Sequence, residues 1–195
     1  MAQSLNTKNP FVDYSSRLQA ILSSSEWSAV AKLAEDMHKC WKEGRRVFLC
    51  GNGGSAGNAI HLANDFLYGI AKQTGKGLKV SALSSNSAVI TCLANDVGYD
   101  SIFSEQLAVQ AEKGDLLIAL SGSGNSKNIL KVIEQAKLMA VKSYAILGFT
   151  GGLSKTLVDV PIHFPVNDMQ IAEDLQIIVG HMLMQWLSNN RPEMG

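Results

Sequence analysis

Five short apolar runs, separated by segments with helical periodicity, constrain the fold of this chain more than any other feature of its sequence. The runs lie at 47–50, 78–83, 116–120, 144–147 and 160–164. Three of them are apolar at successive positions, which is typical of strands buried on both faces of a parallel sheet. Helices must then cover both faces. The sequence therefore predicts a doubly wound, three-layer α/β sandwich with a five-stranded parallel sheet.

Helices are expected between and around these strands. Those between the strands should lie at 55–71, 86–111, 127–139 and 151–157, the second broken near Gly98. Two amphipathic helices at 11–23 and 26–43 precede the first strand, and a long helix at 168–188 follows the last one. Because the 195 residues contain no repeat and no linker, we expect a single domain over 1–195, with 1–44 as an N-terminal helical pair.

The charge and cysteine content of the chain indicate which binding partners and which cellular compartment to expect. The 17 basic and 17 acidic side chains cancel, so neither nucleic acid nor a membrane is expected as a partner. The charged fraction of 17% lies below the usual value of about 25%, which indicates that part of the surface is buried in an oligomer. The N-terminus lacks the apolar core of a signal peptide, and the three cysteines form no CxxC pair. We therefore expect a cytoplasmic protein.

Two strand–helix turns are rich in glycine and serine. The first run is followed by GNGGS at 51–55, and the third by SGSGNS at 121–126. Small residues let the backbone approach a ligand, and a helix N-terminus favours an anion. Neither turn fits a P-loop or a dinucleotide-binding fingerprint. Tight turns use the same residues, so both alternatives stay open for the first turn, whereas the serines of the second suit a phosphomonoester.

Two of the expected helices carry acid–base groups. His61 and Asp65 lie four residues apart and share a helix face. Glu173 and His181 lie eight apart on the last helix, again on roughly one face. Because the last helix is otherwise strongly apolar, polar groups there need partners, a metal ion or a catalytic role. The alternative is that the histidines are hydrogen-bonded core residues and that Asp65 only forms an intrahelical pair.

Six segments together resemble one family along nearly the whole chain. They are CGNGGS at 50–55, HLA at 61–63, ANDVGY at 94–99, SGSGNS at 121–126, the glycines of 148–152, and His181. The chain is similar in these segments to the SIS (sugar isomerase) domain family, and within it to the phosphoheptose isomerases. The resemblance implies an aldose–ketose isomerase that converts sedoheptulose 7-phosphate to D-glycero-D-manno-heptose 7-phosphate through an enediol, for the heptose of lipopolysaccharide or capsule.

The resemblance also implies roles for individual residues. The substrate would be bound by Asn52, Gly53, Ser55, Asn95, Asp96, Ser121, Ser123 and Ser126, with the four serines at the phosphate. Proton transfer would use Asp65 and His181, with Glu173 as a second carboxylate. One zinc ion per subunit would be held by His61, Asp65, Glu173 and His181. The assembly would be a homotetramer whose active sites lie between subunits.

The chain departs from the family in the two helices that carry these groups. Asp65 stands where the family has a glutamate, Glu173 where it has a glutamine, and Gly69 where an arginine is common. Zinc accepts either Asp or Glu, but a general base must reach its proton at hydrogen-bond distance. The alternative function is therefore a non-catalytic SIS protein that binds a phosphosugar or associates with the replication initiator.

Overall fold

The five expected strands form one parallel sheet in the computed structural model, which describes residues 9–72 and 75–192. The strands are β1 (Arg46–Gly51), β2 (Lys79–Ala82), β3 (Leu116–Ser121), β4 (Lys142–Leu147) and β5 (Val160–His163). Their order in the sheet is β2-β1-β3-β4-β5, and all neighbouring pairs are parallel. The strand order reverses between β1 and β3, so the switch point where such sheets bind ligands lies at the ends of these two strands.

Helices alternate with the strands as expected. They are α1 (Pro10–Ser24), α2 (Ser28–Lys42), α3 (Gly54–Leu67), α4 (Ser87–Asp96), α5 (Ser104–Gln110), α6 (Lys127–Leu138), α7 (Ser154–Leu157) and α8 (Met169–Asn189), with short 3-10 helices η1 (Gly69–Ala71) and η2 (Tyr99–Ser101). The break near Gly98 is confirmed, and this glycine has a φ of +98°. The helix expected at 151–157 is wrong in its first turn, because Gly151 and Gly152 have φ of +83° and +54°, outside the right-handed helical region.

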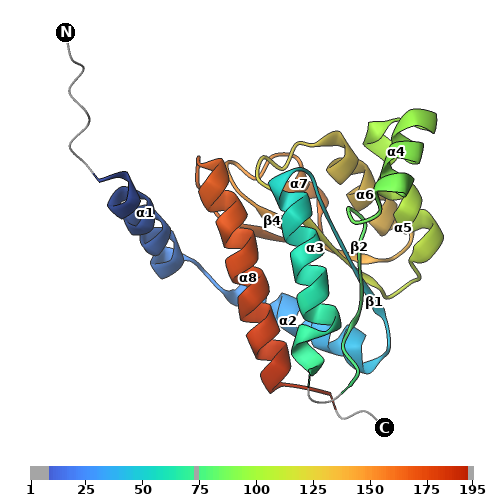
Figure 1. The fold of residues 1–195 in the computed structure, drawn as a ribbon, viewed down its shortest axis with the longest axis horizontal. Coiled ribbons are helices and arrows are strands. Elements are labelled where there is room, and N and C mark those ends of the chain that lie inside the picture. The colour runs from blue at the N-terminus through green and yellow to red at the C-terminus, as the bar shows by residue number, and fades with distance from the viewer. Residues whose placement is uncertain (1–8, 73–74, 193–195) are drawn as a thin grey trace.

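Two hydrophobic cores lie on opposite faces of the sheet. On β1, Val47 and Leu49 face the core that contains α2, α3 and α8, whereas Phe48 and Cys50 face the core that contains α5 and α6. This alternation follows from the two-residue period of a strand, and both sets are apolar because both faces are covered. Helices α3 and α8 lie side by side on the same face (Figure 1). The three-layer sandwich is therefore confirmed.

The N-terminal helices behave differently from each other. Helix α2 buries Leu33 and Met37 completely in the first core, whereas α1 has no buried residue and extends away from the body (Figure 1). It is tied to α8 by two bonds, from the Tyr14 hydroxyl to Asp174 (2.5 Å) and from the Arg17 guanidinium to Asp168 (2.6 Å). The first eight residues of the predicted N-terminal pair lie outside the described residues.

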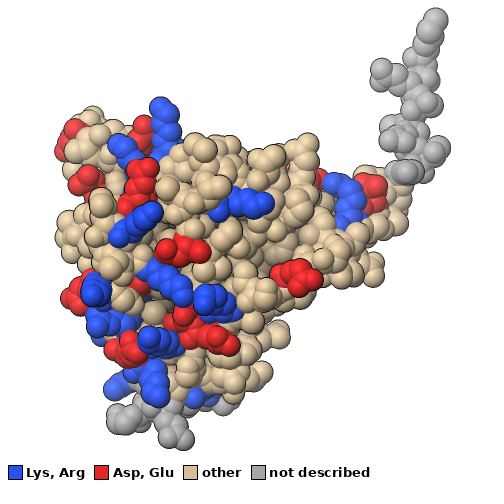
Figure 2. Space-filling view, turned by 180° about the vertical axis from the view of Figure 1, so that it is seen from behind, with Lys and Arg blue, Asp and Glu red and all other residues tan. Residues whose placement is uncertain are grey.

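Charged side chains of both signs lie close together on one face of the molecule. On the face seen in Figure 2, Lys and Arg lie next to Asp and Glu, and large areas between them carry no charged side chain. Within the described residues, no helix combines the length and the hydropathy needed to cross a bilayer.

Candidate active site

A pocket of about 270 Å³ opens at the carboxyl ends of β1 and β3. It is lined by Asn52, Gly53, Gly54, Ser55, Leu120, Ser121, Gly122, Ser123, Ser126, Met169 and Glu173. The two glycine- and serine-rich turns therefore meet at the switch point of the sheet, because β1 and β3 are neighbours there. We call it the serine pocket.

Two helix N-termini face the serine pocket without side-chain caps. Gly53, which has no side chain, precedes α3, and Ser126, whose side chain makes no bond to the first turn, precedes α6. By contrast, α8 is capped by Asp168, whose carboxylate accepts from the N–H groups of Gln170 and Ile171. Uncapped first turns leave N–H groups and the positive end of the helix dipole for a ligand. This end of the sheet is therefore suited to an anion.

The four predicted serines all lie in the pocket lining. Ser55 and Ser121 are 4% and 5% exposed. The Oγ of Ser55 accepts from Gln176 (3.0 Å) and that of Ser121 from the Gly124 N–H (3.1 Å), while Ser123 Oγ accepts from the Asn125 N–H (3.3 Å). A hydroxyl that accepts one bond still has its own hydrogen to donate. The pocket therefore offers a set of neutral donors for a phosphate group.

Close packing explains glycines in and beside the pocket lining. A Cβ at Gly54 would collide with the carboxylate of Glu173, and one at Gly124 would collide with the backbone of Gly151. Gly53 has a φ of +55° and a ψ of −122° as the chain enters α3. These positions let the backbone approach a ligand and let the two turns lie against their neighbours.

Asn95 and Asp96 are not brought into this pocket. They lie at the end of α4, are exposed, and hydrogen-bond to each other (2.8 Å). The Asn95 amide and the Cys92 thiol hold the pKa of the Asp96 carboxyl below its usual value. Within one chain, these two predicted substrate residues are therefore not part of the lining of the serine pocket.

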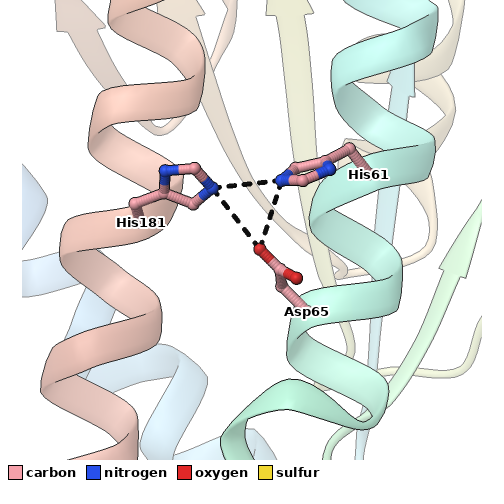
Figure 3. Close-up of side chains that lie close together, drawn as sticks. All are labelled: His61, Asp65 and His181. Carbon is pink, nitrogen blue, oxygen red and sulfur yellow. Dashed lines mark hydrogen bonds and ion pairs between the residues drawn. The ribbon is translucent and has the colours of Figure 1, made fainter.

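A second cluster lies farther along α3 and α8. His61 and Asp65 of α3 point toward His181 of α8 (Figure 3). The two histidine Nε2 atoms are 3.0 Å apart, and Asp65 Oδ2 lies 3.3 Å from His61 Nε2 and 3.5 Å from His181 Nε2. The histidine side chains are about half exposed (50% and 47%), whereas Asp65 is 14% exposed. The helix packing therefore brings three of the predicted acid–base residues together at a solvent-accessible position.

Glu173, the fourth predicted member of this cluster, lies elsewhere. Its carboxylate lines the serine pocket against Gly54 and has no hydrogen-bond partner among the described residues. Two residues of one helix that are eight apart are separated by about 12 Å along the axis, which explains the distance from His181. The expected four-residue metal set is thus assembled only in part, as His61, Asp65 and His181.

The geometry of these three residues fits a metal ion. With zinc–ligand bonds of about 2.0–2.1 Å, neighbouring ligand atoms of a tetrahedron are about 3.3 Å apart. The observed separations of 3.0, 3.3 and 3.5 Å bracket this value. Three protein ligands with one open position are typical of catalytic rather than structural zinc. His61, Asp65 and His181 could therefore hold such an ion.

Sequence reasoning missed the amides that support the site. Gln176 is fully buried and bonds Ser55, and its Oε1 accepts from the Asn58 amide (3.0 Å). Asn128 is 2% exposed and bonds Asn52. The signal for Gln176 was a polar residue inside an apolar helix, because a buried amide needs partners. Asn128 offered no comparable signal.

Comparison with known proteins identifies the family of this chain. The SIS domain model matches residues 10–148. A phosphoheptose isomerase from Aliarcobacter butzleri is 37% identical over 148 residues, covering 76% of this chain and 78% of that protein. One from Chlorobaculum parvum is 33% identical over 174 residues, covering 88% and 83%.

Solved structures agree with these relatives. The structure of a phosphoheptose isomerase from Francisella tularensis superposes with a TM-score of 0.89 at 26% identity, covering 96% of this chain and 100% of that one. A domain model that spans residues 10–148, relatives above 30% identity and a shared fold all agree. The chain belongs to the SIS domain family and, within it, to the phosphoheptose isomerase group.

Proposed function

We propose that the protein is an aldose–ketose isomerase that converts sedoheptulose 7-phosphate to D-glycero-D-manno-heptose 7-phosphate. One observation carries the proposal: a pocket of neutral hydrogen-bond donors, at the uncapped N-termini of α3 and α6, shares helices α3 and α8 with the cluster of His61, Asp65 and His181. A phosphorylated sugar can bind with its phosphate in the serine pocket and extend along α3 and α8 toward the cluster. The names of the relatives, phosphoheptose isomerases, support this substrate.

The phosphate is bound by the serine pocket. Ser55, Ser121, Ser123 and Ser126 donate hydroxyl hydrogens, and the first turns of α3 and α6 donate backbone N–H groups. Binding of this remote group holds the reacting carbons near the catalytic groups. Such positioning lowers the activation free energy by several kcal/mol in favourable cases.

We propose zinc as the metal ion held by His61, Asp65 and His181. Zinc, when bound there, polarises a carbonyl or hydroxyl oxygen of the sugar. The three side chains then have their ligand atoms committed to the ion, so Asp65 no longer serves as a base.

Glu173 is the carboxylate that removes the proton from carbon 1 of the ketose. Its carboxylate lines the pocket and has no hydrogen-bond partner among the described residues, and the residue is half-buried, so the carboxylate oxygens are available. The C–H electron pair forms the enediol double bond, the C2 oxygen gains a proton and the C1 oxygen loses one. Return of a proton to carbon 2 gives the aldose. Where no metal ion is bound, the exposed imidazole of His181 shifts the proton between the two oxygens.

We propose that the protein is a homotetramer in which a neighbouring subunit completes the site. Apolar side chains flank the cluster on the outer surface of α3 and α8, with Ile60 43%, Met182 41% and Trp186 37% exposed. Asn95 and Asp96 are exposed at the end of α4, beside Val97 at 54%. A neighbouring subunit can cover these apolar surfaces and can bring Asn95 and Asp96 to a site between subunits, as the resemblance implies.

Proton NMR in D₂O tests the reaction directly. The protein is incubated with sedoheptulose 7-phosphate, with and without zinc, and a new aldose anomeric signal with deuterium incorporation at carbon 1 or 2 is expected. Phosphate binding without turnover or deuterium incorporation would instead support the non-catalytic phosphosugar-binding protein.

Two variants separate the carboxylates. Glu173→Gln should stop deuterium incorporation but bind inorganic phosphate at least as tightly, because it removes a negative charge from the pocket. Full turnover in Glu173→Gln, together with none in Asp65→Asn even when zinc is supplied, would assign the base to Asp65.

A further inference from the structure

Three side chains tie the two turns of the serine pocket together. Asn52, in the turn after β1, and Asn128, in the first turn of α6, form a reciprocal amide pair. Asn52 Nδ2 donates to Asn128 Oδ1 (2.8 Å), and Asn128 Nδ2 donates to Asn52 Oδ1 (2.9 Å). The Tyr99 hydroxyl donates to the same Asn52 Oδ1 (3.0 Å). We call these three residues the amide clamp.

The clamp occupies most of the bonding capacity of Asn52. An amide oxygen accepts two hydrogen bonds, and Asn52 Oδ1 accepts from both Asn128 and Tyr99. Asn128 is 2% exposed, so its amide would be costly to bury without these bonds. Asn52 is therefore engaged mainly with protein groups, although it lines the pocket.

The amide clamp lies where it can set the distance between the two groups of donors that would bind an anion. One half lies beside Gly53, before the uncapped first turn of α3, and the other half lies in the uncapped first turn of α6. The donors to a phosphate come from both turns, so their separation decides whether all of them reach its oxygens. A change in that separation would leave some donors out of hydrogen-bond reach and weaken phosphate binding.

We propose that Asn128, with Tyr99, is a positioning residue for the phosphate site, and that Asn52 acts as the other half of this clamp rather than as a separate substrate ligand. The inference rests on the proposed function only in taking the serine pocket as the phosphate site. It also assigns a role to the tyrosine of the ANDVGY segment, which lies outside the pocket lining.

A double-mutant cycle on phosphate affinity tests the clamp. The affinity of the full-length protein for inorganic phosphate is measured by calorimetry for Asn52→Ala, Asn128→Ala and the double variant. Each single variant should bind roughly tenfold more weakly, because each removes both reciprocal bonds. The double variant should lose no more than Asn52→Ala alone, which also removes the bond from Tyr99, since the pair is already broken. Losses that multiply would mean that Asn52 binds the ligand directly and would overturn the proposal, as would unchanged affinity in Asn128→Ala.

Further measurements keep the test independent of folding and of turnover. Tyr99→Phe removes a single clamp bond without a change of shape and should weaken phosphate binding by roughly two- to tenfold. Asn189→Ala, at the exposed end of α8, is the matched control and should bind phosphate like the wild type. With sedoheptulose 7-phosphate, the clamp variants should raise KM far more than they lower kcat; an equal loss in kcat would contradict a phosphate-positioning role. Because phosphate binding requires no reaction, failure of the clamp and failure of the isomerase proposal are distinguishable.

Discussion

Gly180 sets how closely α8 approaches α3, and Gly180→Ala tests this directly. A Cβ at this position would lie 2.7 Å from Leu62 Cδ1 and 2.9 Å from Cγ, and closer still to Cδ2. Leu62 is 1% exposed, so it has no free space into which to move. Overpacking of this kind costs about 1–3 kcal/mol, and contact with three atoms points to the upper end. Alanine also favours a helix over glycine by about 1 kcal/mol.

Gly180→Ala should lower the free energy of unfolding by about 2 kcal/mol. Overpacking against Leu62 costs about 3 kcal/mol, and the higher helix propensity of alanine offsets about 1 kcal/mol of it. For a chain of this size, that lowers Tm by roughly 4–8 °C. The sign should reverse in a Leu62→Ala background, because all three clashing atoms are gone there. In that background Gly180→Ala should stabilise the protein by about 1 kcal/mol.

Urea unfolding followed by circular dichroism, at one protein concentration, measures all four members of this cycle. Gly57→Ala is the matched control, since Gly57 also lies within α3 but a Cβ there meets nothing within 4 Å. It should stabilise the protein by up to about 1 kcal/mol. If Gly180→Ala were equally destabilising with and without the Leu62 side chain, the contact between the two helices would not be the cause.

Three further predictions follow from individual contacts. Asp168→Ala removes the cap of α8 and should cost about 1 kcal/mol in thermal unfolding, while Asp168→Asn keeps the cap. The Arg17 guanidinium lowers the pKa of the Asp168 carboxyl in the folded protein. The stability that the Asp168 carboxylate contributes is therefore present above the usual carboxyl pKa and is lost as the pH falls through the lowered pKa. In strong acid, Asp168→Ala and the wild type should have the same stability. Tyr144→Phe removes the hydroxyl that donates to Asp36 and should cost about 1 kcal/mol in urea unfolding at neutral pH; no loss would show that water replaces the bond. Asp65→Asn should weaken zinc binding by more than about tenfold, measured by competition with a chelator, since loss of even an outer-shell partner has that effect.

Much of the fold follows from local patterns. The strands and helices were predicted within a few residues because burial of both sheet faces leaves continuous apolar runs, and helices leave a regular apolar stripe. The parallel arrangement also places the turns after β1 and β3 at the same edge of the sheet, but their meeting in one pocket depends on the adjacency of the two strands, which the structure shows. The first turn expected at 151–157 was wrong, because periodicity does not register that two glycines have positive φ.

The chemistry of α3 and α8 was only half visible in the sequence. Spacing placed His61 with Asp65, and Glu173 with His181, on common helix faces, but a shared face does not place two side chains at one point. Contact between His61 and His181 depends on the register and closeness of two helices whose contact residues are 120 positions apart. The amide clamp depends in the same way on segments that are distant in the chain.

The sequence by itself thus determined the elements, the parallel type of the sheet and the two glycine- and serine-rich turns, because each arises from neighbouring residues. Only the tertiary structure decided that Glu173 lies in the serine pocket while Asp65 joins both histidines. The physical reason is the packing of Gly180 against Leu62, which fixes how α8 lies on α3 and therefore which of its polar groups meet.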